Sequence, residues 1–471
     1  VGDVLARYHR LAGKDTFFLT GTDEHGQKIA TAAAESQQTP LQFCDRYVQE
    51  FQQLNHALLI ATDRHVRTTA EAHKHTAQGL LQRAIDADAV YLGTYSGWYN
   101  VREEAFVSEL DASNLYYRDP VTGVPLKRME EESYFLRTSQ YQDRLLRHIR
   151  KSPGFICPRP RRNEILRRLE VPLTDISISR TTCQWGIPFP QHPEHVMYVW
   201  FDALASYLSG IGFPESDQAH FWPADVHLIG KDIVWFHAVL WPCMLMALDL
   251  PLPKAVFAHG FVNDHSGRKM SKTLGNVVDP MDLLEQYPAD TVRSALVSRV
   301  TLGEDVPFSE EVLLQLHNSH LANTIGNCLS RCVSLCRKYC DGAVPDVDAL
   351  EVFDLEAVRA STADAYRDYE LHTAYNIALE CAKDINGFLQ MHAPWESDDP
   401  EDRNVTVRSA LEALYMAAHF LAPFLPSGCA GIFQALNTDP VGLWALSPAG
   451  DNLKPGTRIA SGKKILYPKI R

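Results

Sequence analysis

The 471-residue sequence lacks the motifs that define several large classes of enzyme. It has no G-x-x-x-x-G-K-[ST] loop, no G-x-S-x-G elbow, and no G-x-G-x-x-G turn after its first apolar run. These absences disfavour a Walker-type nucleotidase, an elbow-type hydrolase and a dinucleotide-binding fold. No apolar run reaches the roughly 18 residues that a membrane helix needs, so we expect no membrane partner.

Metal-ligand spacing is also absent, because the ten cysteines include no C-x-x-C pair. Zinc is therefore not indicated. Cys328, Cys332, Cys336 and Cys340 recur every four residues, which stacks them along one helix face. Thiols that rise one turn apiece do not converge on one point, so we expect small buried core residues in a protein of a reducing compartment.

The net charge of −13 argues against bulk, sequence-independent binding of nucleic acid. Two local basic stretches stand out nevertheless. The stretch "RPRRNEILRR" (Arg159 to Arg168) is either a nucleic-acid patch or a solvated helix face. The stretch "GRKMSKTLGN" (Gly267 to Asn276) is either a solvated turn or a Gly-flanked loop whose lysines meet a polyphosphate.

Periodicity divides the chain into five regions. Residues 1–90 and 161–310 alternate helical patterns with the short strand-like runs "TFFLTGTDEHG", "VMYVWFDAL", "DVHLIGKDI" and "KAVFAHGFV". This alternation predicts one parallel sheet wound with helices, with ligands at the carboxyl ends of the strands. Residues 91–160 read as a mixed insertion, residues 311–450 as an α-helical bundle, and residues 451–471 as a Pro/Gly-rich tail.

Polar residues follow three of the predicted strands, in "GTDEHG", "IGKDIVWFH" and "GRKMSKTLGN". We expect them to gather at one edge of the sheet. A carboxylate there suits an ammonium or ribose hydroxyls, and a lysine pair suits phosphates. The predicted ligands are therefore a nucleotide and a small amino compound. The residues concerned are Asp23, His25, Lys231, Asp232, His237, Lys269 and Lys272.

The segment "KMSKT" followed by "LGN" resembles the KMSKS signature of class I aminoacyl-tRNA synthetases. The ordered set "GTDEHGQKIA", "YVWFDAL", "IGKDIVWFHAVLWP", "HGFV", "NTIGNCLSR", "HAPW" and "PGTRI…LYPKI" resembles the methionyl-tRNA synthetase family over essentially the whole chain. The resemblance implies an α/β fold: a Rossmann-type catalytic domain with a connective insertion, then an α-helical anticodon-binding domain. It also implies that methionine and ATP give methionyl-adenylate and pyrophosphate, and that methionine then passes to the 3′-terminal adenosine of tRNA(Met).

The resemblance also implies roles for individual residues. For methionine it points to Asp23, His25, Tyr198, Trp200, Ala203, Tyr207, Ile233, His237 and Trp241, although Trp241 is equally well read as core. For ATP it points to Gly230, Lys231, Asp232, Lys269 and Lys272. Lys269, Lys272 and Arg180 would be catalytic, and the anticodon would meet Asn323, Asn327, Arg331 and Trp395, with Arg331 alternatively a plain surface arginine.

The sequence departs from the family in two places. The HIGH-type tetrapeptide is absent, and "VGDVLARYHRL" resembles the helix that follows it, so we expect the motif to precede Val1. Where many relatives carry zinc-binding cysteines, this chain has Asn100 and Glu103, so we expect no structural zinc. We expect Mg²⁺ to enter with ATP, the protein to be a monomer, and its location to be cytoplasmic or organellar (mitochondrion or plastid).

Two alternatives remain open. One is a class I synthetase for another amino acid, such as leucine or cysteine; a zinc-dependent cysteine site is disfavoured because no ligand cluster is present. The other is a non-catalytic tRNA-binding relative. The presence of Asp23, Asp232, Lys269 and Lys272 speaks against this second alternative.

Overall fold

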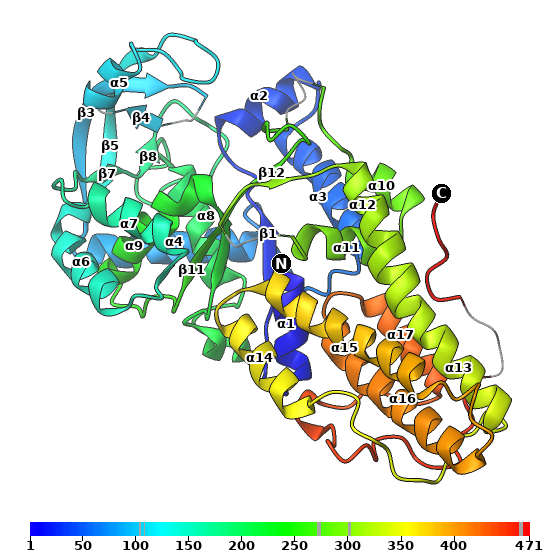
Figure 1. The fold of residues 1–471 in the computed structure, drawn as a ribbon. Coiled ribbons are helices and arrows are strands. Elements are labelled where there is room, and N and C mark those ends of the chain that lie inside the picture. The colour runs from blue at the N-terminus through cyan, green and yellow to red at the C-terminus, as the bar shows by residue number, and fades with distance from the viewer. Residues whose placement is uncertain (103–104, 108, 271–274, 300–302, 461–464) are drawn as a thin grey trace. The chain divides into compact units, whose positions relative to one another are not determined.

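The computed structural model describes residues 1–471 apart from 103–104, 108, 271–274, 300–302 and 461–464 (Figure 1). The chain forms two compact units. The first comprises Val1–Phe18, Gln53–Ala61 and Gly260–Arg471, and the second comprises Leu19–Gln52 and Thr62–His259. We call them the helical unit and the sheet unit.

The sheet unit contains two parallel ladders. Strand β1 (Leu19–Thr22) pairs with β2 (Arg64–Arg67), and β10 (His227–Gly230) pairs with β11 (Val256–His259), which also pairs with β6 (Ile156–Cys157). A core of aliphatic residues from β6, β10, β11 and the neighbouring helices packs behind the second ladder. Parallel strands are therefore confirmed, but the described strands form separate ladders and not the single sheet that we expected.

Helices and short turns cover these strands. The α-helices of the sheet unit are α2 (Gln27–Glu35), α3 (Pro40–Ala57, which continues into the helical unit), α4 (Glu71–Asp86), α6 (Gln142–Lys151), α7 (Arg159–Arg168), α8 (Val199–Ser209) and α9 (Trp241–Ala247). Shorter helical turns are η1 (Thr138–Tyr141), η2 (Asp217–Phe221), η3 (Lys231–Ile233) and the π-helical η4 (Phe236–Leu240). The basic stretch at Arg159 is thus α7.

The run "VMYVWFDAL" was predicted to be a strand, and this prediction was wrong. Only Val196–Met197 is extended, as β9, and it pairs antiparallel with β8 (Ser179–Arg180). From Val199 the chain is helical, as α8. An apolar run that short is ambiguous between a strand and a buried helix, and here the helix continues through "ALASYLS", beyond the length of the run.

The strands of the insertion pair antiparallel. Strand β3 (Val90–Asn100) pairs with β4 (Ala105–Val107) and β5 (Lys127–Leu136), and β5 pairs with β7 (Ile176–Ser177); α5 spans Glu109–Asn114. At the far end of β3, Asn100 Nδ2 and Arg102 Nε donate to Asp119 Oδ2 at 2.7 and 2.8 Å. Glu103 lies outside the described residues. Hydrogen bonds to Asp119 therefore hold this part of the insertion together.

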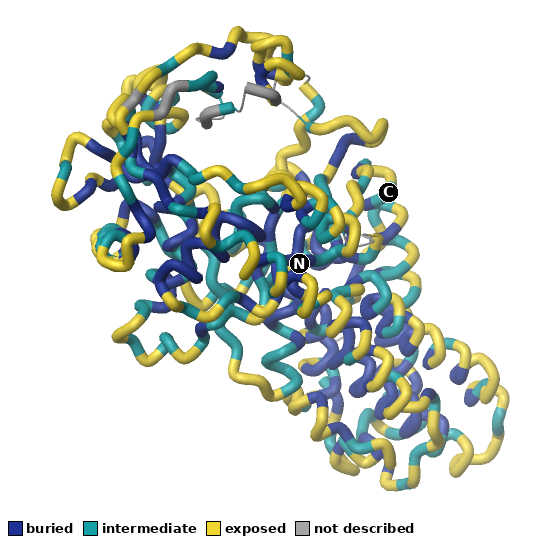
Figure 2. Tube along the Cα trace, turned by 90° about the vertical axis from the view of Figure 1, so that its left-hand side faces the viewer, coloured by how far each residue is buried: buried dark blue, intermediate teal, exposed yellow. Residues whose placement is uncertain are grey.

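The helical unit is a bundle around α16 (Pro400–Leu421), a helix that is buried over most of its length. All residues of α16 from Thr406 onward are buried, and Figure 2 shows buried positions gathered inside the bundle. The helices are α1 (Gly2–Leu11), α10 (Pro280–Gln286), α11 (Ala289–Val297), α12 (Glu310–Leu316), α13 (Asn327–Tyr339), α14 (Leu355–Arg367), α15 (Leu371–His392), α16 and α17 (Pro426–Leu436). Also present are the π-helical η6 (His317–Gly326), the short η7 (Leu443–Ala445), and β12 (Val262–Asn263), parallel to β13 (Val306–Pro307).

The cysteine row lies in this bundle, on α13. Cys328, Cys332 and Cys336 are buried, as predicted for small core residues, whereas Cys340 at the end of the helix is partly exposed. In the part of the chain that the structure describes, no helix is long and apolar enough to cross a membrane.

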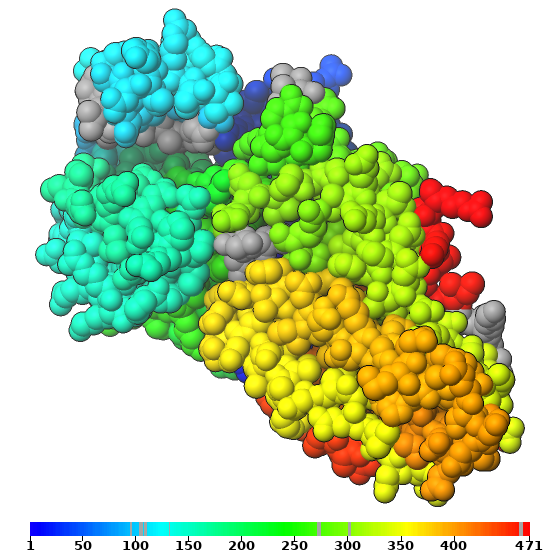
Figure 3. Space-filling view, in the orientation of Figure 1, coloured from blue at the N-terminus to red at the C-terminus, as the bar shows by residue number. Residues whose placement is uncertain are grey.

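The tail packs against the bundle. Tyr467 is buried and its hydroxyl donates to Asp290 Oδ2 at 2.6 Å, while the same carboxylate accepts the backbone N–H of Gly428 in the first turn of α17. Asn318 Nδ2 donates to the backbone carbonyl of Ile470 at 2.8 Å. Figure 3 shows the last residues, in red, lying against the surface of the yellow-green helices.

Arg293 is the main polar anchor of the helical unit. Its guanidinium donates to Asp3 Oδ2 at 2.5 Å, to the Leu58 carbonyl at 3.0 Å and to the Pro423 carbonyl at 2.8 Å. Both charged groups are buried. Burial disfavours the charged form of Asp3, but Arg293, together with Arg7 and a backbone N–H, holds the pKa of Asp3 below its usual value. The Arg293 guanidinium thereby joins three segments that are distant in sequence, those around Asp3, Leu58 and Pro423.

Replacing Arg293 with leucine should therefore destabilise the protein strongly. The change leaves Asp3 and several carbonyls without their buried donor, which lowers the free energy of unfolding by about 3–5 kcal/mol. Chemical denaturation measures this. Arg367→Ala, at an exposed ion pair with Asp364, is the control and should change stability little; equal effects of the two substitutions would contradict the anchor role.

Candidate active site and anticodon surface

The loop after β1 is locked by a buried carboxylate. The Glu24 carboxylate accepts hydrogen bonds from two nitrogens of the Arg67 guanidinium, Nε at 2.7 Å and Nη2 at 2.9 Å, and from the Thr22 hydroxyl at 2.5 Å. Burial raises the pKa of Glu24, but these hydrogen bonds outweigh burial and lower it. Its neighbour Asp23 is exposed. The loop thus fixes Glu24 inward and presents the Asp23 carboxylate at the carboxyl end of a parallel strand.

A second buried carboxylate, Asp202 on α8, lies between two imidazoles. Its Oδ2 is 2.6 Å from His25 Nδ1, and its Oδ1 is 2.7 Å from His73 Nε2. The remaining nitrogen of His73 lies 2.7 Å from the Ser209 hydroxyl. Burial disfavours the charged Asp202, but the hydrogen bonds from His25 and His73 lower its pKa. Asp202 therefore ties the loop after β1, α4 and α8 into one rigid assembly.

Tyr207, on the same helix, faces an imidazole. The Tyr207 hydroxyl is 2.7 Å from His237 Nε2, and His237 Nδ1 is 3.0 Å from the Ile233 carbonyl. Because a carbonyl only accepts, Nδ1 carries the proton, and Nε2 accepts from Tyr207. Burial lowers the pKa of His237 to about 4 and raises the pKa of Tyr207. The pair is uncharged at neutral pH.

Aromatic rings surround this pair. Trp200 is stacked on Phe236 at 3.9 Å and meets His237 edge-on at 6.0 Å between ring centroids. Trp241 is fully buried, 6.1 Å from the Tyr207 ring, and its indole N–H donates to His227 Nε2 at 3.2 Å. Burial lowers the pKa of His227 to about 3, so it too stays neutral. Aromatic rings and an uncharged Tyr207–His237 pair therefore form one cluster, in which Trp241 is fully buried as part of the core.

The Asp232 carboxylate lies close to the Gly230 backbone, which explains the glycine in "IGKDI". A Cβ atom on Gly230 would lie 2.6 Å from Asp232 Oδ1, so a side chain there would displace that carboxylate. Lys231 and Asp232 follow directly in η3, and Asp232 is exposed. The three residues expected to meet ATP in this segment therefore lie together at the carboxyl end of β10.

Arg180 is the last residue of β8, where it pairs with Val196 of β9, and it is buried. Its Nη1 donates to the Ser177 hydroxyl at 2.6 Å and to the Ser179 carbonyl at 2.7 Å, and its guanidinium lies 4.5 Å from the ring centroid of Tyr198. Arg180 and Tyr198 line a cavity of about 170 Å³ that also borders Gly26, next to His25. Arg180 and Tyr198 are thus brought together at the loop after β1.

The lysine-rich loop belongs to the helical unit, and an aspartate orders its first half. Asp264 accepts the backbone N–H groups of Ser266 and Arg268 and the Asn276 amide, all at 2.9 Å. Lys269 Nζ lies 4.8 Å from the ring centroid of Phe261. Gly267 and Gly275 have φ values of 76° and 63°, which favour glycine. Lys272 lies outside the described residues.

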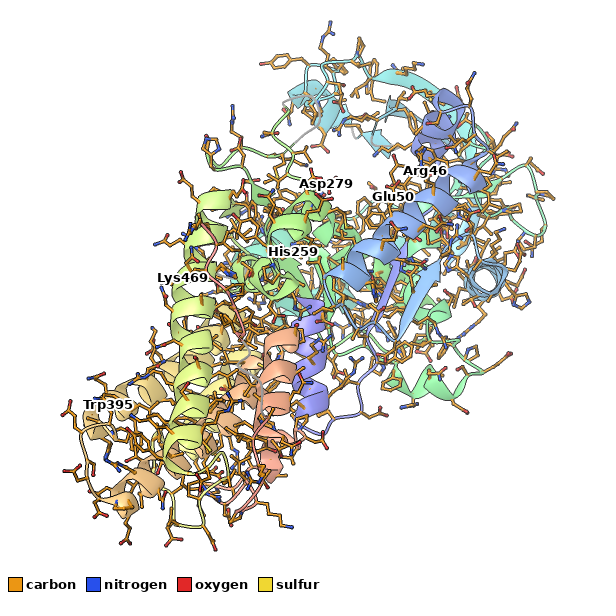
Figure 4. All side chains as sticks on the ribbon, turned by 90° about the vertical axis from the view of Figure 1, so that its right-hand side faces the viewer. Arg46, Glu50, His259, Asp279, Trp395 and Lys469 are labelled. Carbon is orange, nitrogen blue, oxygen red and sulfur yellow. The ribbon has the colours of Figure 1, made fainter. Side chains whose placement is uncertain are left out.

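The four residues expected to read the anticodon come from η6, from α13 and from the turn that follows α15. Asn323 and Asn327 are exposed, and Arg331 follows one turn later with its guanidinium 5.6 Å from the Trp395 ring centroid. The Trp395 side chain is exposed and lies at the periphery of the helical unit, away from Lys469 (Figure 4). Arg331, Trp395 and Asn327 thus share one surface.

Sequence reasoning missed several residues that organise these sites: Glu24, His73, Asp202, Asp264 and Asn386. A signal existed for Asp202, because a charged residue inside the apolar run "YVWFDALASYL" must be buried and therefore paired. His73 carried no such signal, since its partner is 129 positions away. Only the fold brings these groups together.

Sequence comparison identifies the class. The family described as "tRNA synthetases class I (M)" matches residues 1–113 and 119–333, and the "Anticodon binding domain of methionyl tRNA ligase" matches residues 375–471. The chain belongs to the class I tRNA synthetases of this methionyl family. The resemblance and the fold class inferred from the sequence are thereby confirmed.

Individual relatives are similar over nearly the whole chain. The methionine–tRNA ligase of Thermotoga maritima is 40% identical over 489 aligned residues, covering 100% of this chain and 76% of that protein. The Mycobacterium bovis enzyme of the same name is 40% identical, covering 97% and 91%. The crystal structure of Mycobacterium tuberculosis methionyl-tRNA synthetase bound by methionyl-adenylate has a TM-score of 0.90 at 37% identity, covering 99% of this chain and 95% of that one.

The buried Asp202 network makes a testable prediction. Asp202→Asn keeps the shape but cannot accept from both imidazoles as a charged group, so the free energy of unfolding should fall by about 1.5–3 kcal/mol. Because α8 carries Tyr207, the affinity for methionine should fall as well. Denaturation and calorimetry measure the two effects. Glu71→Gln on the exposed face of α4 is the control, and an Asp202→Asn protein as stable as this control would contradict the assignment.

Proposed function

We propose that the protein is a methionine–tRNA ligase. It activates methionine with ATP, releasing pyrophosphate, and transfers methionine from the adenylate to the 3′-terminal adenosine of tRNA(Met). The single observation that carries the choice of amino acid is the uncharged Tyr207–His237 pair surrounded by aromatic rings, in a chain of the methionyl family.

The chemistry of the pocket fits a thioether. A polarizable sulfur makes favourable contacts with aromatic rings, each worth about 0.3–1.5 kcal/mol. An uncharged wall does not penalise an apolar side chain, whereas a charged His237 would. Asp23, exposed at the carboxyl end of β1, is suited to the methionine ammonium. These features together favour methionine over amino acids with charged side chains.

Adenylate formation requires no general base, because the methionine carboxylate is itself the nucleophile at the α-phosphorus. The carboxylate oxygen forms a bond to that phosphorus while the bond to the pyrophosphate oxygen breaks. The work left to the protein is positioning and charge stabilisation. We assign Asp232 to the ribose, Gly230 and Lys231 to the nucleotide, Arg180 to the adenylation site, and Lys269 and Lys272 to the triphosphate.

Two finer features belong to the proposal. Mg²⁺ enters with ATP and is held chiefly by its phosphates; among the described residues no group of three or more His, Cys, Asp or Glu side chains could hold a metal by itself. The protein acts as a monomer, which sedimentation would test.

The direct test is amino-acid-dependent exchange of pyrophosphate into ATP by the full-length protein. Methionine should support exchange far better than leucine or cysteine. An absence of exchange with any amino acid would favour the non-catalytic relative, and preferential exchange with another amino acid would show a different synthetase.

Lys272→Ala should separate catalysis from binding. If Lys272 neutralises charge on the departing pyrophosphate, its loss removes an interaction made mainly in the transition state. Single-turnover adenylation should then slow by about 100-fold or more, while methionine affinity measured by calorimetry changes little. An equal loss of rate and affinity would contradict this role.

Trp395→Ala should separate charging from activation. Stacking of an unpaired base on an aromatic ring contributes about 1–3 kcal/mol. Transfer of methionine to tRNA(Met) should therefore weaken by about tenfold or more in kcat/KM, with pyrophosphate exchange unchanged. A parallel loss of exchange would indicate that Trp395 serves the fold.

A further inference from the structure

Asn386, in the C-terminal half of α15, contacts two of the residues expected to read the anticodon, Arg331 and Asn327. Its Oδ1 lies 3.3 Å from Arg331 Nη1 and 3.4 Å from Asn327 Nδ2, and its backbone carbonyl accepts Arg331 Nη1 at 3.0 Å. One residue on a neighbouring helix therefore holds both an amide and a guanidinium of the surface.

The amide of Asn386 has only one favourable orientation. Its Nδ2 donates to the Thr324 carbonyl at 3.1 Å and to the Ala382 carbonyl at 2.9 Å. A flipped amide would place its oxygen against two carbonyls and its N–H groups against the donors of Arg331 and Asn327. The Asn386 Oδ1 atom must therefore face Arg331 and Asn327.

The Thr324 carbonyl lies in η6, the π-helical segment that precedes α13. A π-helical segment departs from regular α-helical hydrogen bonding, and such segments are frequent at functional sites. By donating to this carbonyl, Asn386 ties the end of η6 to α15. The relative positions of Asn327 and Arg331, which follow directly, are thereby fixed against α15.

Arg331 in turn borders Trp395, with 5.6 Å between the guanidinium carbon and the ring centroid. A long arginine side chain that is free to rotate loses about 1.5–2 kcal/mol of conformational entropy when a ligand immobilises it. Held by Asn386 before binding, Arg331 has already lost much of this freedom. The exposed ring of Trp395 is left available for a base.

We propose that Asn386 is a positioning residue for anticodon recognition, acting through Arg331 and Asn327 rather than on the nucleotide itself. The inference rests on the proposed function and deepens it. It gives α15 a part in anticodon recognition. The sequence had indicated only residues of η6 and α13 together with Trp395.

The test uses the full-length protein and a labelled RNA hairpin with a CAU loop, with binding followed by fluorescence anisotropy. Asn386→Ala should weaken hairpin binding by about tenfold, the effect of one hydrogen bond to a charged group. A hairpin with a scrambled loop should bind the variant and the unchanged protein equally. Asn404→Ala, another partly exposed asparagine of the bundle, is the matched control and should bind normally.

A double-mutant cycle distinguishes positioning from a general structural role. If Asn386 acts through Arg331, the Arg331→Ala, Asn386→Ala double variant should bind about as weakly as Arg331→Ala alone. Additive losses, or unchanged binding in Asn386→Ala, would overturn the proposal. So would a thermal unfolding midpoint that falls much further in Asn386→Ala than in Asn404→Ala.

Pyrophosphate exchange tests the proposed ligase function independently of hairpin binding. Asn386→Ala should exchange as fast as the unchanged protein, because the partners of the Asn386 side chain are not among the residues assigned to methionine or ATP. If the unchanged protein fails to exchange with methionine, the ligase function fails, while hairpin binding still decides the role of Asn386.

Discussion

The candidate methionine pocket depends on one buried carboxylate held between two imidazoles. Asp202 could not remain charged in the core without His25 and His73, whose hydrogen bonds outweigh the cost of its burial. Through His25 it fixes the loop that presents Asp23, and through its own helix it fixes Tyr207. Removing this carboxylate would loosen both Asp23, which is assigned to the methionine ammonium, and Tyr207, which is assigned to the methionine side chain.

The candidate methionine site and the candidate anticodon surface differ in how far their side chains are buried. In the sheet unit the Glu24 and Asp202 carboxylates are buried and hydrogen-bonded, and burial keeps His237 and His227 neutral. In the helical unit the Trp395 ring beside Arg331 is exposed, as the proposed contact with an unpaired base requires. Rigid preorganisation by neighbouring residues, Asp202 in one unit and Asn386 in the other, is common to both.

Much of the fold and of the candidate site was predictable from the sequence. The helical patterns expected within residues 1–90 are confirmed by α1, α3 and α4, and the polar residues expected after two of the strands do follow β1 and β10. The run around Asp202 was misassigned because a short apolar stretch fits a strand as well as a buried helix. The contacts of His73 and Asn386 were not predictable, since each depends on partners brought together only by tertiary packing.

The central claim is that an uncharged Tyr207–His237 pair receives the methionine side chain. Calorimetric titration of methionine between pH 8 and pH 5 tests it most directly, because the amino acid's own charges are constant over that range. Burial lowers the pKa of His237 to about 4, so the Kd for methionine should stay nearly constant. A Kd that rises steadily below about pH 6.5, the ordinary pKa of histidine, would show that the pocket histidine is charged as usual and would contradict the account.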